Sequence, residues 1–257
     1  MGAEQAYERM AGLYDAFTAH HDYELWLGNL IPAAERAGLA GRRALDIGCG
    51  TGKSFVPLRR RGWQVTACDI SPRMLERARE RARGRVRLLV ADARALPALG
   101  RFDLVYALDD VVNYLADSSE LESFLCGAAR NLAPGGLVLF DANTLQTYRT
   151  FFAEETTETS AGLELTACGR TSPDAEPGVA AEIVFEAREH SGAPAMEPSL
   201  HRQRHHPPAT VIDALGAAGL DCVAVYGHDE DAVLRQPLDE LAHAKAIYIA
   251  RARSEGR

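Results

Sequence analysis

One stretch decides the fold: Asp46-Ile47-Gly48-Cys49-Gly50-Thr51-Gly52-Lys53-Ser54. Its three glycines stand at alternate positions and follow directly on a short apolar run, Arg43 to Ile47, that is typical of a buried strand. Glycine accepts the left-handed backbone conformations of tight turns and lets another group approach the backbone closely. The stretch therefore predicts a strand, a sharp turn and a helix, with room for a ligand beside the turn.

Strands and helices alternate on the C-terminal side of this stretch. Ser71 followed by Pro72 favours the start of a helix, and a second helical pattern covers 119–132. Repeated strand–helix pairs predict right-handed crossovers and a doubly wound parallel sheet, an α/β fold. We expect strands at 43–47, 64–68, 86–90, 102–108 and 137–140, and, after an insertion, at 221–226 and 246–250.

Neither common phosphate-binding motif fits the glycine stretch. A P-loop needs Gly-x-x-x-x-Gly-Lys-Ser/Thr, and Gly52-Lys53-Ser54 supplies its end, but Ile47 stands where the first glycine is needed. A dinucleotide fingerprint needs Gly-x-Gly-x-x-Gly, and counting from Gly48 places Lys53 at the third glycine. Each motif fails by one residue, so nucleotide phosphates and NAD are disfavoured as ligands.

The pattern that does fit is Asp-x-Gly-x-Gly-x-Gly over Asp46 to Gly52, followed by Asp69 and Asp92 at the ends of the next two strands. In order and spacing it resembles the class I S-adenosylmethionine-dependent methyltransferases over about residues 40–145. The resemblance implies a Rossmann-like sheet of seven strands, S-adenosyl-L-methionine as cofactor and S-adenosyl-L-homocysteine as product. Tight turns alone are the alternative explanation, because aspartate and glycine both favour turns.

The resemblance also implies roles for single residues. Asp69 would accept hydrogen bonds from both ribose hydroxyls, and Ile70 and Met74 would flank the adenine. Asp92 and the backbone of Ala93 would bind the adenine edge. The implied cofactor-binding set is Tyr14, Tyr23, Asp46, Gly48, Cys49, Gly50, Thr51, Gly52, Asp69, Ile70, Met74, Asp92, Ala93, Leu108 and Asp109.

Two helical patterns, at 6–17 and 22–37, precede the glycine stretch. Their Tyr14-Asp15 and Asp22-Tyr23 elements resemble the N-terminal cap of deoxysugar N,N-dimethyltransferases and glycine N-methyltransferase-like enzymes. In that resemblance both tyrosines contact the methionine end of the cofactor or its methyl group. Packing as core tyrosines is the alternative.

The alternation of strands and helices breaks between 144 and 206, where polar antiparallel strands are expected at 162–169, 179–189 and 199–205. In the same enzyme branches an insertion at this place covers the active site, which favours a small-molecule pocket. The expected division is a helical cap at 1–40, a cofactor-binding core at 41–143 and 207–257, and an antiparallel β lid at 144–206.

Ligands of open α/β sheets bind at the carboxyl ends of the strands, so the polar residues that follow the fourth and fifth strands are candidates for the acceptor site. His201 and His205 join them because they share one face of a strand. No metal site is expected, since no pattern of His, Cys and carboxylate ligands is complete. The candidates are Asn113, Tyr114, Asp141, Asn143, His201 and His205 for substrate binding, and His20, His21, Asp110 and His206 as catalytic bases.

The expected reaction is in-line displacement, in which a nitrogen or oxygen atom of a small molecule attacks the sulfonium methyl group. An alcohol or an ammonium would need a base, whereas a neutral amine would not. A role in specialised metabolism fits the resemblance. Methylation of protein or RNA is an alternative, suggested by the arginine-rich helix at 73–87, and so is cofactor binding without turnover.

The composition of the chain disfavours several classes of binding partner. The 257 residues carry a formal net charge of −8, which disfavours nucleic acid and anionic membranes as partners. The sequence has no run that approaches a membrane span and no basic and apolar leader at its start. Its five cysteines are widely separated, which favours reduced thiols and a cytoplasmic location. A homodimer is left open.

Overall fold

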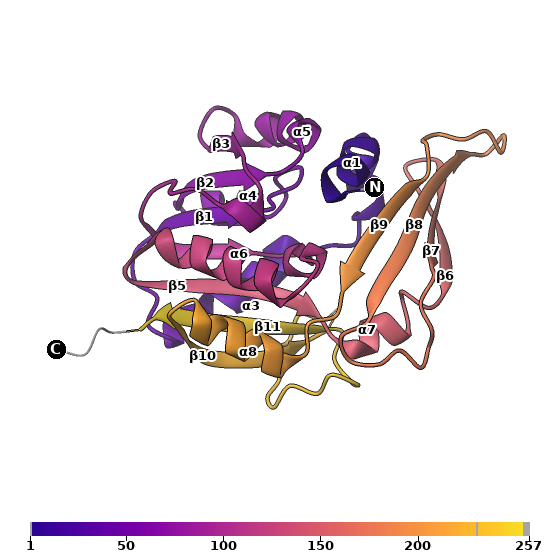
Figure 1. Ribbon diagram of the computed structural model, residues 1–257. Coiled ribbons are helices and arrows are strands. Elements are labelled where there is room, and N and C mark those ends of the chain that lie inside the picture. The colour runs from indigo at the N-terminus through magenta and orange to yellow at the C-terminus, as the bar shows by residue number, and fades with distance from the viewer. Residues whose placement is uncertain (1, 230, 254–257) are drawn as a thin grey trace.

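The computed structural model describes residues 2–229 and 231–253, and its main sheet confirms the predicted α/β fold. The strands of this sheet are β1 (Arg43–Ile47), β2 (Gln64–Asp69), β3 (Arg87–Val90), β4 (Phe102–Ala107), β5 (Leu132–Asn143), β10 (Leu220–His228) and β11 (Lys245–Ala252). They run in the order β10-β11-β5-β4-β1-β2-β3 (Figure 1). β11 pairs antiparallel with β5 and β10, whereas β1 to β5 pair in parallel. The parallel strands therefore end at one common edge.

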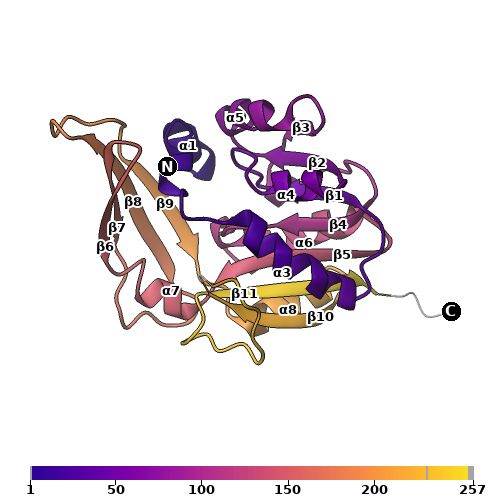
Figure 2. The same cartoon turned by 180° about the vertical axis from the view of Figure 1, so that it is seen from behind.

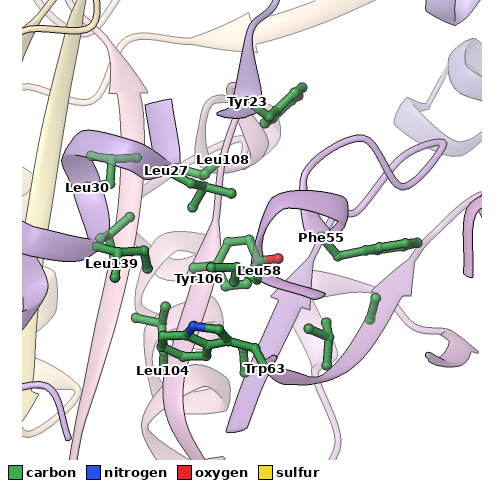
Figure 3. Close-up of a cluster of buried hydrophobic side chains, with 14 of the residues drawn as sticks. Tyr23, Leu27, Leu30, Phe55, Leu58, Trp63, Leu104, Tyr106, Leu108 and Leu139 are labelled. Carbon is green, nitrogen blue, oxygen red and sulfur yellow. The ribbon is translucent and has the colours of Figure 1, made fainter. Parts of the chain in front are cut away.

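Helices cover both faces of the main sheet (Figures 1 and 2). One face carries α3 (Tyr23–Arg36), α4 (Phe55–Arg60) and α5 (Pro72–Ala82), and the other carries α6 (Ser118–Arg130) and α8 (Pro208–Ala217). On the first face Leu27, Leu30 and Leu58 form one buried cluster with Tyr106 and Leu139 of the sheet (Figure 3). Burial of this apolar surface holds the strands, and hence the polar residues at their ends, in place.

A second, antiparallel sheet stands beside the carboxyl ends of the parallel strands (Figures 1 and 2). The sequence predicts three of its strands but misses the first, and it also misses the short helix before it. The missed strand consists of Glu and polar residues that are exposed along almost its whole length, so no alternation of apolar residues marks it. The elements are α7 (Leu145–Arg149), β6 (Glu155–Ser160), β7 (Leu163–Gly169), β8 (Ala180–Glu189) and β9 (Ser199–Arg204).

The prediction of one continuous helix at 6–17 is wrong. The segment is split into α1 (Ala3–Met10) and α2 (Tyr14–Phe17) by a turn. α1 lies between α5 and β9 (Figure 1). The Glu8 carboxylate accepts a hydrogen bond from the backbone N–H of Arg73, and the Ser199 hydroxyl donates to the backbone carbonyl of Ala6. The N-terminal segment thus bridges the main sheet and the second sheet.

The fifth strand begins earlier than predicted. β5 extends back through Pro134-Gly135-Gly136, where the sequence predicts a turn before the strand. Its register with β4 shifts between Phe102 and Leu104 at this point. The Pro-Gly-Gly segment therefore forms an irregularity inside the strand and not a separate connection.

The predicted division into cap, core and lid stays a prediction, and parts of its ranges (1, 230 and 254–257) lie outside the described residues. Within the described part of the chain, no helix is both long enough and apolar enough to cross a bilayer.

Candidate active site

A cavity of about 230 Å³ lies beside the glycine stretch, at the carboxyl ends of the parallel strands. We call it the glycine-loop cavity. Several residues predicted to bind the cofactor line it: Tyr14, Gly48, Gly50, Asp69, Ile70, Asp92, Ala93 and Asp109. Residues of α1 complete its wall, among them Tyr7, which sequence reasoning missed because no motif includes it.

Two glycines of the loop have backbone conformations that other residues adopt with strain. Gly48 and Gly50 have φ angles of +70° and +53°. A Cβ atom on Gly48 would lie 2.5 Å from a methyl carbon of Val111, and one on Gly50 would lie 3.5 Å from the ring of Tyr14. The bare backbone therefore forms part of the cavity wall at a place where a side chain would fill it.

Asp69, at the end of β2, is held by the loop that it faces. One carboxylate oxygen accepts a hydrogen bond from the backbone N–H of Gly50 at 2.7 Å, and the other accepts one from the N–H of Ser71 at 2.9 Å. Burial raises the pKa of Asp69 to about 6, although these hydrogen bonds oppose the shift. Each oxygen keeps a lone pair with which it can accept a hydroxyl group of a ligand.

Asp92 lies against Arg94, whose backbone N–H and guanidinium both donate to the carboxylate. Burial alone would raise the pKa of Asp92, but the hydrogen bonds from Arg94 outweigh it and lower that pKa. Asp92 is therefore a charged acceptor at the cavity wall, and Arg94 fixes its orientation.

Other residues predicted to contact the cofactor lie behind the cavity wall, and their contact with the cofactor stays a prediction. Asp46 accepts a hydrogen bond from the Ser54 hydroxyl at 2.5 Å, and burial raises the pKa of Asp46 to about 7. Thr51 donates to Asp15 at 2.6 Å. These contacts hold the loop against the strands and the N-terminal segment. The other residues behind the wall are Tyr23, Cys49, Gly52, Met74 and Leu108.

A second cavity, of about 340 Å³, lies between the main sheet and the second sheet. We call it the insertion cavity. One of its sides is apolar and includes Met10, Phe17, Phe152, Ile183 and Phe185. It shares four lining residues with the glycine-loop cavity, so the two cavities meet at Tyr7, Tyr14, Asp109 and Tyr114.

Asp109 is the polar centre of this junction. Its Oδ2 atom accepts hydrogen bonds from Tyr14 at 3.3 Å and Tyr23 at 3.0 Å, and it lies 2.9 Å from Nδ1 of His21. Burial alone would raise the pKa of Asp109, but His21 and the nearby Lys245 hold it well below its usual range. Because an ionised carboxylate only accepts, Nδ1 of His21 carries the hydrogen.

Lys245 at the start of β11 was not predicted. Its ammonium binds Asp110 and lies 2.8 Å from Asp141 and 3.7 Å from Asp109. Burial alone would lower the pKa of Lys245, but the three carboxylates raise it well above its usual value. Lys245 is far from these aspartates in sequence, and only the pairing of β11 with β5 brings it to them. The single ammonium group of Lys245 therefore lies among three carboxylates.

The predicted residues Tyr114 and His201 come together in the insertion cavity. The Tyr114 hydroxyl lies 2.8 Å from Nδ1 of His201, whose Nε2 lies 3.0 Å from the Ser199 hydroxyl. Since Ser199 donates to a backbone carbonyl, it accepts from Nε2 of His201, and Nδ1 accepts from Tyr114. Burial lowers the pKa of His201 to about 4, so the imidazole is neutral.

Gln203, on the same strand face as His201, was not among the predicted site residues. Its side-chain amide donates to Asp110 at 3.3 Å and accepts from the amide of Asn143 at 3.0 Å. Asp110, His20, His21 and Asn143 also line the insertion cavity, and their roles toward a substrate stay predictions.

Two histidines predicted at the acceptor site line neither cavity, and their roles stay predictions. His206 is buried and donates from Nε2 to the backbone carbonyl of Leu115 at 3.1 Å. His205 accepts from the backbone N–H of Gly178 and contacts Glu240 at 2.8 Å. Both histidines hold the end of β9 and do not face a reacting group.

Asn113 and Asp141 also lie behind the wall of the insertion cavity. Asn113 donates to the backbone carbonyl of Arg204 and accepts from the backbone N–H of Asn143. Asp141 supports Lys245, and burial raises the pKa of Asp141 to about 6 against the pull of that ammonium. Both residues were predicted to bind substrate, and from this position any such contact would be indirect.

A family model described as a methyltransferase domain matches residues 44–136. A protein of Geobacillus sp. (strain WCH70) that is named as a methyltransferase is 29% identical over 202 residues, which cover 77% of this chain and 81% of its own length. A methyltransferase-named protein of Bacillus subtilis (strain 168) is 30% identical over 141 residues. That match covers 54% of this chain and 56% of the relative, so the chain spans about half the length of this second protein.

Solved structures agree with these matches. An S-adenosylmethionine-dependent methyltransferase from Clostridium acetobutylicum has a TM-score of 0.79 at 21% identity, covering 96% of this chain and 99% of that one. CalS10 from Micromonospora echinaspora, an amino pentose methyltransferase solved with S-adenosylmethionine and described as involved in calicheamicin biosynthesis, has a TM-score of 0.72 at 20% identity, with coverage of 93% and 95%. These likenesses show the fold, and the matches of sequence show the activity.

By its matched domain and its relatives, the chain is an S-adenosylmethionine-dependent methyltransferase.

The cofactor of this methyltransferase is S-adenosylmethionine, and the glycine-loop cavity fits it. The cavity has a backbone wall at Gly48 and Gly50, as close approach to a ligand requires. Asp69 presents carboxylate oxygens that would suit ribose hydroxyls, and Ile70 also lines the cavity with an apolar side chain. The cavity thus suits the cofactor in its shape and in the groups that line it.

Replacing Gly48 by alanine should weaken binding of S-adenosylmethionine at least tenfold. The added methyl group strains the backbone and clashes with Val111, which also lines the cavity, and we expect a loss of about 1–3 kcal/mol in the free energy of unfolding. Isothermal titration and urea unfolding measure the two effects. Gly62→Ala is the matched control, because Gly62 also has a positive φ but no atom lies within 4 Å of its added Cβ. Equal affinities of the two variants would contradict this role of Gly48.

Lowering the pH should weaken binding of S-adenosylmethionine below pH 6. With a pKa of about 6, Asp69 is ionised above that pH and protonated below it, and the ionised form is the better acceptor for hydroxyl groups. Titration calorimetry should show a constant Kd near pH 8, and a Kd that rises about tenfold for each pH unit below 6. Asp69→Asn should bind weakly at every pH. Persistence of the same pH step in this variant would assign it to another group.

Proposed function

We propose that this methyltransferase transfers the methyl group to the nitrogen of a small-molecule amine, with S-adenosylmethionine in the glycine-loop cavity and the amine in the insertion cavity. The observation that carries the proposal is the ionised Asp109 carboxylate at the junction of the two cavities. A carboxylate in a water-poor junction attracts an ammonium group and repels an anion.

The size and the lining of the insertion cavity support a small acceptor. Its volume of about 340 Å³ is within the range of small-molecule sites. The second sheet and α1 cover it, so a macromolecule would have to insert a narrow segment. Its apolar side suits the carbon skeleton of the acceptor, while the polar side around Asp109 and Asp110 orients the amine.

Bound S-adenosylmethionine supplies an electrophilic methyl carbon on a sulfonium ion, and we propose the in-line course that the sequence suggests. The residues of this chain hold the amine at the junction and exclude water from it. Tyr14 and Tyr23 fix the Asp109 carboxylate by donating to it. The fixed negative charge holds the acceptor nitrogen beside the methyl donor, so positioning supplies most of the rate.

An amine that arrives as an ammonium must lose a proton before it can act as a nucleophile. We propose that His21 takes this proton. Nδ1 of His21 carries a hydrogen and donates it to Asp109, so the ring atom left to accept a proton is Nε2. His21 also lines the insertion cavity. The His21–Asp109 pair also stabilises the imidazolium that would form, because the carboxylate lies 2.9 Å from Nδ1.

The comparison with CalS10 supports an amino group on a hydroxylated ring as acceptor, and a role in specialised metabolism, because that neighbour is described in those terms. The cytoplasmic location and the homodimer stay predictions.

Transfer of labelled methyl groups tests the proposal. The chain should methylate amines such as glucosamine or benzylamine and leave their oxygen counterparts, glucose and benzyl alcohol, unmethylated. Labelled S-adenosylmethionine and mass spectrometry of the products measure this. Label in the alcohols alone, or only in added protein or RNA, would overturn the proposal while leaving the family assignment intact.

Replacing His21 by asparagine should lower kcat about 100-fold near pH 7, because the amide can still donate to Asp109 but cannot take a proton. Activity should partly recover at high pH, where more of the amine arrives neutral, and the Kd for S-adenosylmethionine should stay the same. His190→Asn, at an exposed position in the turn that follows β8, is the control. An unchanged kcat, or a loss that no increase in pH relieves, would speak against a proton acceptor.

A further inference from the structure

A third hollow continues the insertion cavity toward the surface. It has a volume of about 560 Å³ and lies between α3, β6 and the connection from β10 to β11. We call it the outer chamber. It shares His20, His21, Ala244 and Lys245 with the insertion cavity. A ligand longer than the insertion cavity can therefore extend past His21 into the outer chamber.

Trp26 gives this chamber an aromatic wall. Its ring centroid lies 5.3 Å from that of His21, 5.1 Å from that of Tyr23 and 5.7 Å from that of His228. These contacts hold the half-buried indole between the proposed base and the far side of the chamber. An ordered aromatic surface of this kind packs on the C–H face of a ring in a ligand.

His228 lines the chamber with an unpartnered ring nitrogen. The residue is 3% exposed, and its Nε2 atom has no hydrogen-bond partner among the described residues. Burial lowers the pKa of His228 to about 4, so the ring is neutral. A buried polar atom without a hydrogen bond lowers stability. A ligand group that reaches this nitrogen from the chamber would make the missing bond, which is a reason for a ligand to occupy the chamber.

The charges of the chamber and of the insertion cavity have the wrong sign for a phosphate. Glu158 and Asp229 line the chamber, and Asp109 and Asp110 line the insertion cavity. Among the residues that the structure describes, Lys245 is the one lysine or arginine that lines either space, and it is engaged by aspartates. A nucleotide or phosphate group would stand near carboxylates, and the nearby cations Lys245 and Arg235 are already paired with aspartates.

We propose that the outer chamber is a second subsite that binds the far end of the acceptor through hydroxyl or ammonium groups, so that this enzyme methylates a free amine and not one carried on a phosphate or a nucleotide. The proposal rests on the proposed function. The carboxylates of the chamber accept hydrogen bonds from the donor groups of this far end, Trp26 packs on its ring, and His228 adds a directed hydrogen bond.

A matched pair of acceptors tests the subsite: glucosamine and glucosamine 6-phosphate, which differ in one phosphate. We expect kcat/KM for the free amine to exceed that for the phosphate ester at least tenfold. Glu158→Lys should narrow this ratio by raising the activity on the ester, because it places a cation at the chamber. Glu155→Lys is the control, since Glu155 is also exposed on β6 but lies an odd number of residues away, on the other face of the strand.

His228→Leu provides a second readout. It removes the unpartnered nitrogen, so the free energy of unfolding should not fall, while KM for glucosamine should rise about tenfold with kcat unchanged. A phosphate ester used as well as the free amine, or a ratio that responds equally to both lysine variants, would overturn the subsite and leave N-methylation standing. Methylation of benzylamine but of neither sugar would also overturn it. Absence of methyl transfer to every amine would instead contradict the proposed function.

Discussion

The rest of the site depends on the burial of one carboxylate, that of Asp109. Removing a carboxylate from water costs several kcal/mol unless hydrogen bonds and charges replace the water. Here Tyr14, His21 and Tyr23 of the N-terminal region donate to it, and Lys245 of β11 lies nearby. The need to stabilise a single charge therefore joins the beginning of the chain, the end of β4 and the last strand around the point where the two cavities meet.

The same charges serve structure and selectivity. Asp110 and Asp141 bind Lys245 and so attach β11 to the junction. Three carboxylates against one ammonium leave the junction negative, which favours an amine and disfavours a phosphate. A residue that changed the selectivity of this site would therefore also change the contacts that hold it together, and the two effects would have to be separated by measuring stability together with activity.

Local patterns predicted most of the fold and the glycine-loop cavity. Gly48, Gly50 and Asp69 could be identified as site residues because turns and strand ends are recognisable from neighbouring residues in the sequence. Lys245 was missed because only the antiparallel pairing of β11 with β5 brings it to the aspartates. His205 was expected to share a strand face with His201, but β9 ends at Arg204, so the alternation of strand faces no longer applies there. Contacts between distant segments need the folded chain.

Asp109 and Asp110 both have positive φ angles, +69° and +71°. Among residues other than glycine, asparagine and aspartate enter this region at the smallest cost. The backbone thus favours a few residue types at these two positions before any chemistry is considered, and of those types aspartate alone is an anion. In related chains, the turn after β4 would accept loss of the charge through asparagine or glycine at less conformational cost than its replacement by glutamate. The charge is therefore easier to remove from this turn than to move one methylene further into the cavity.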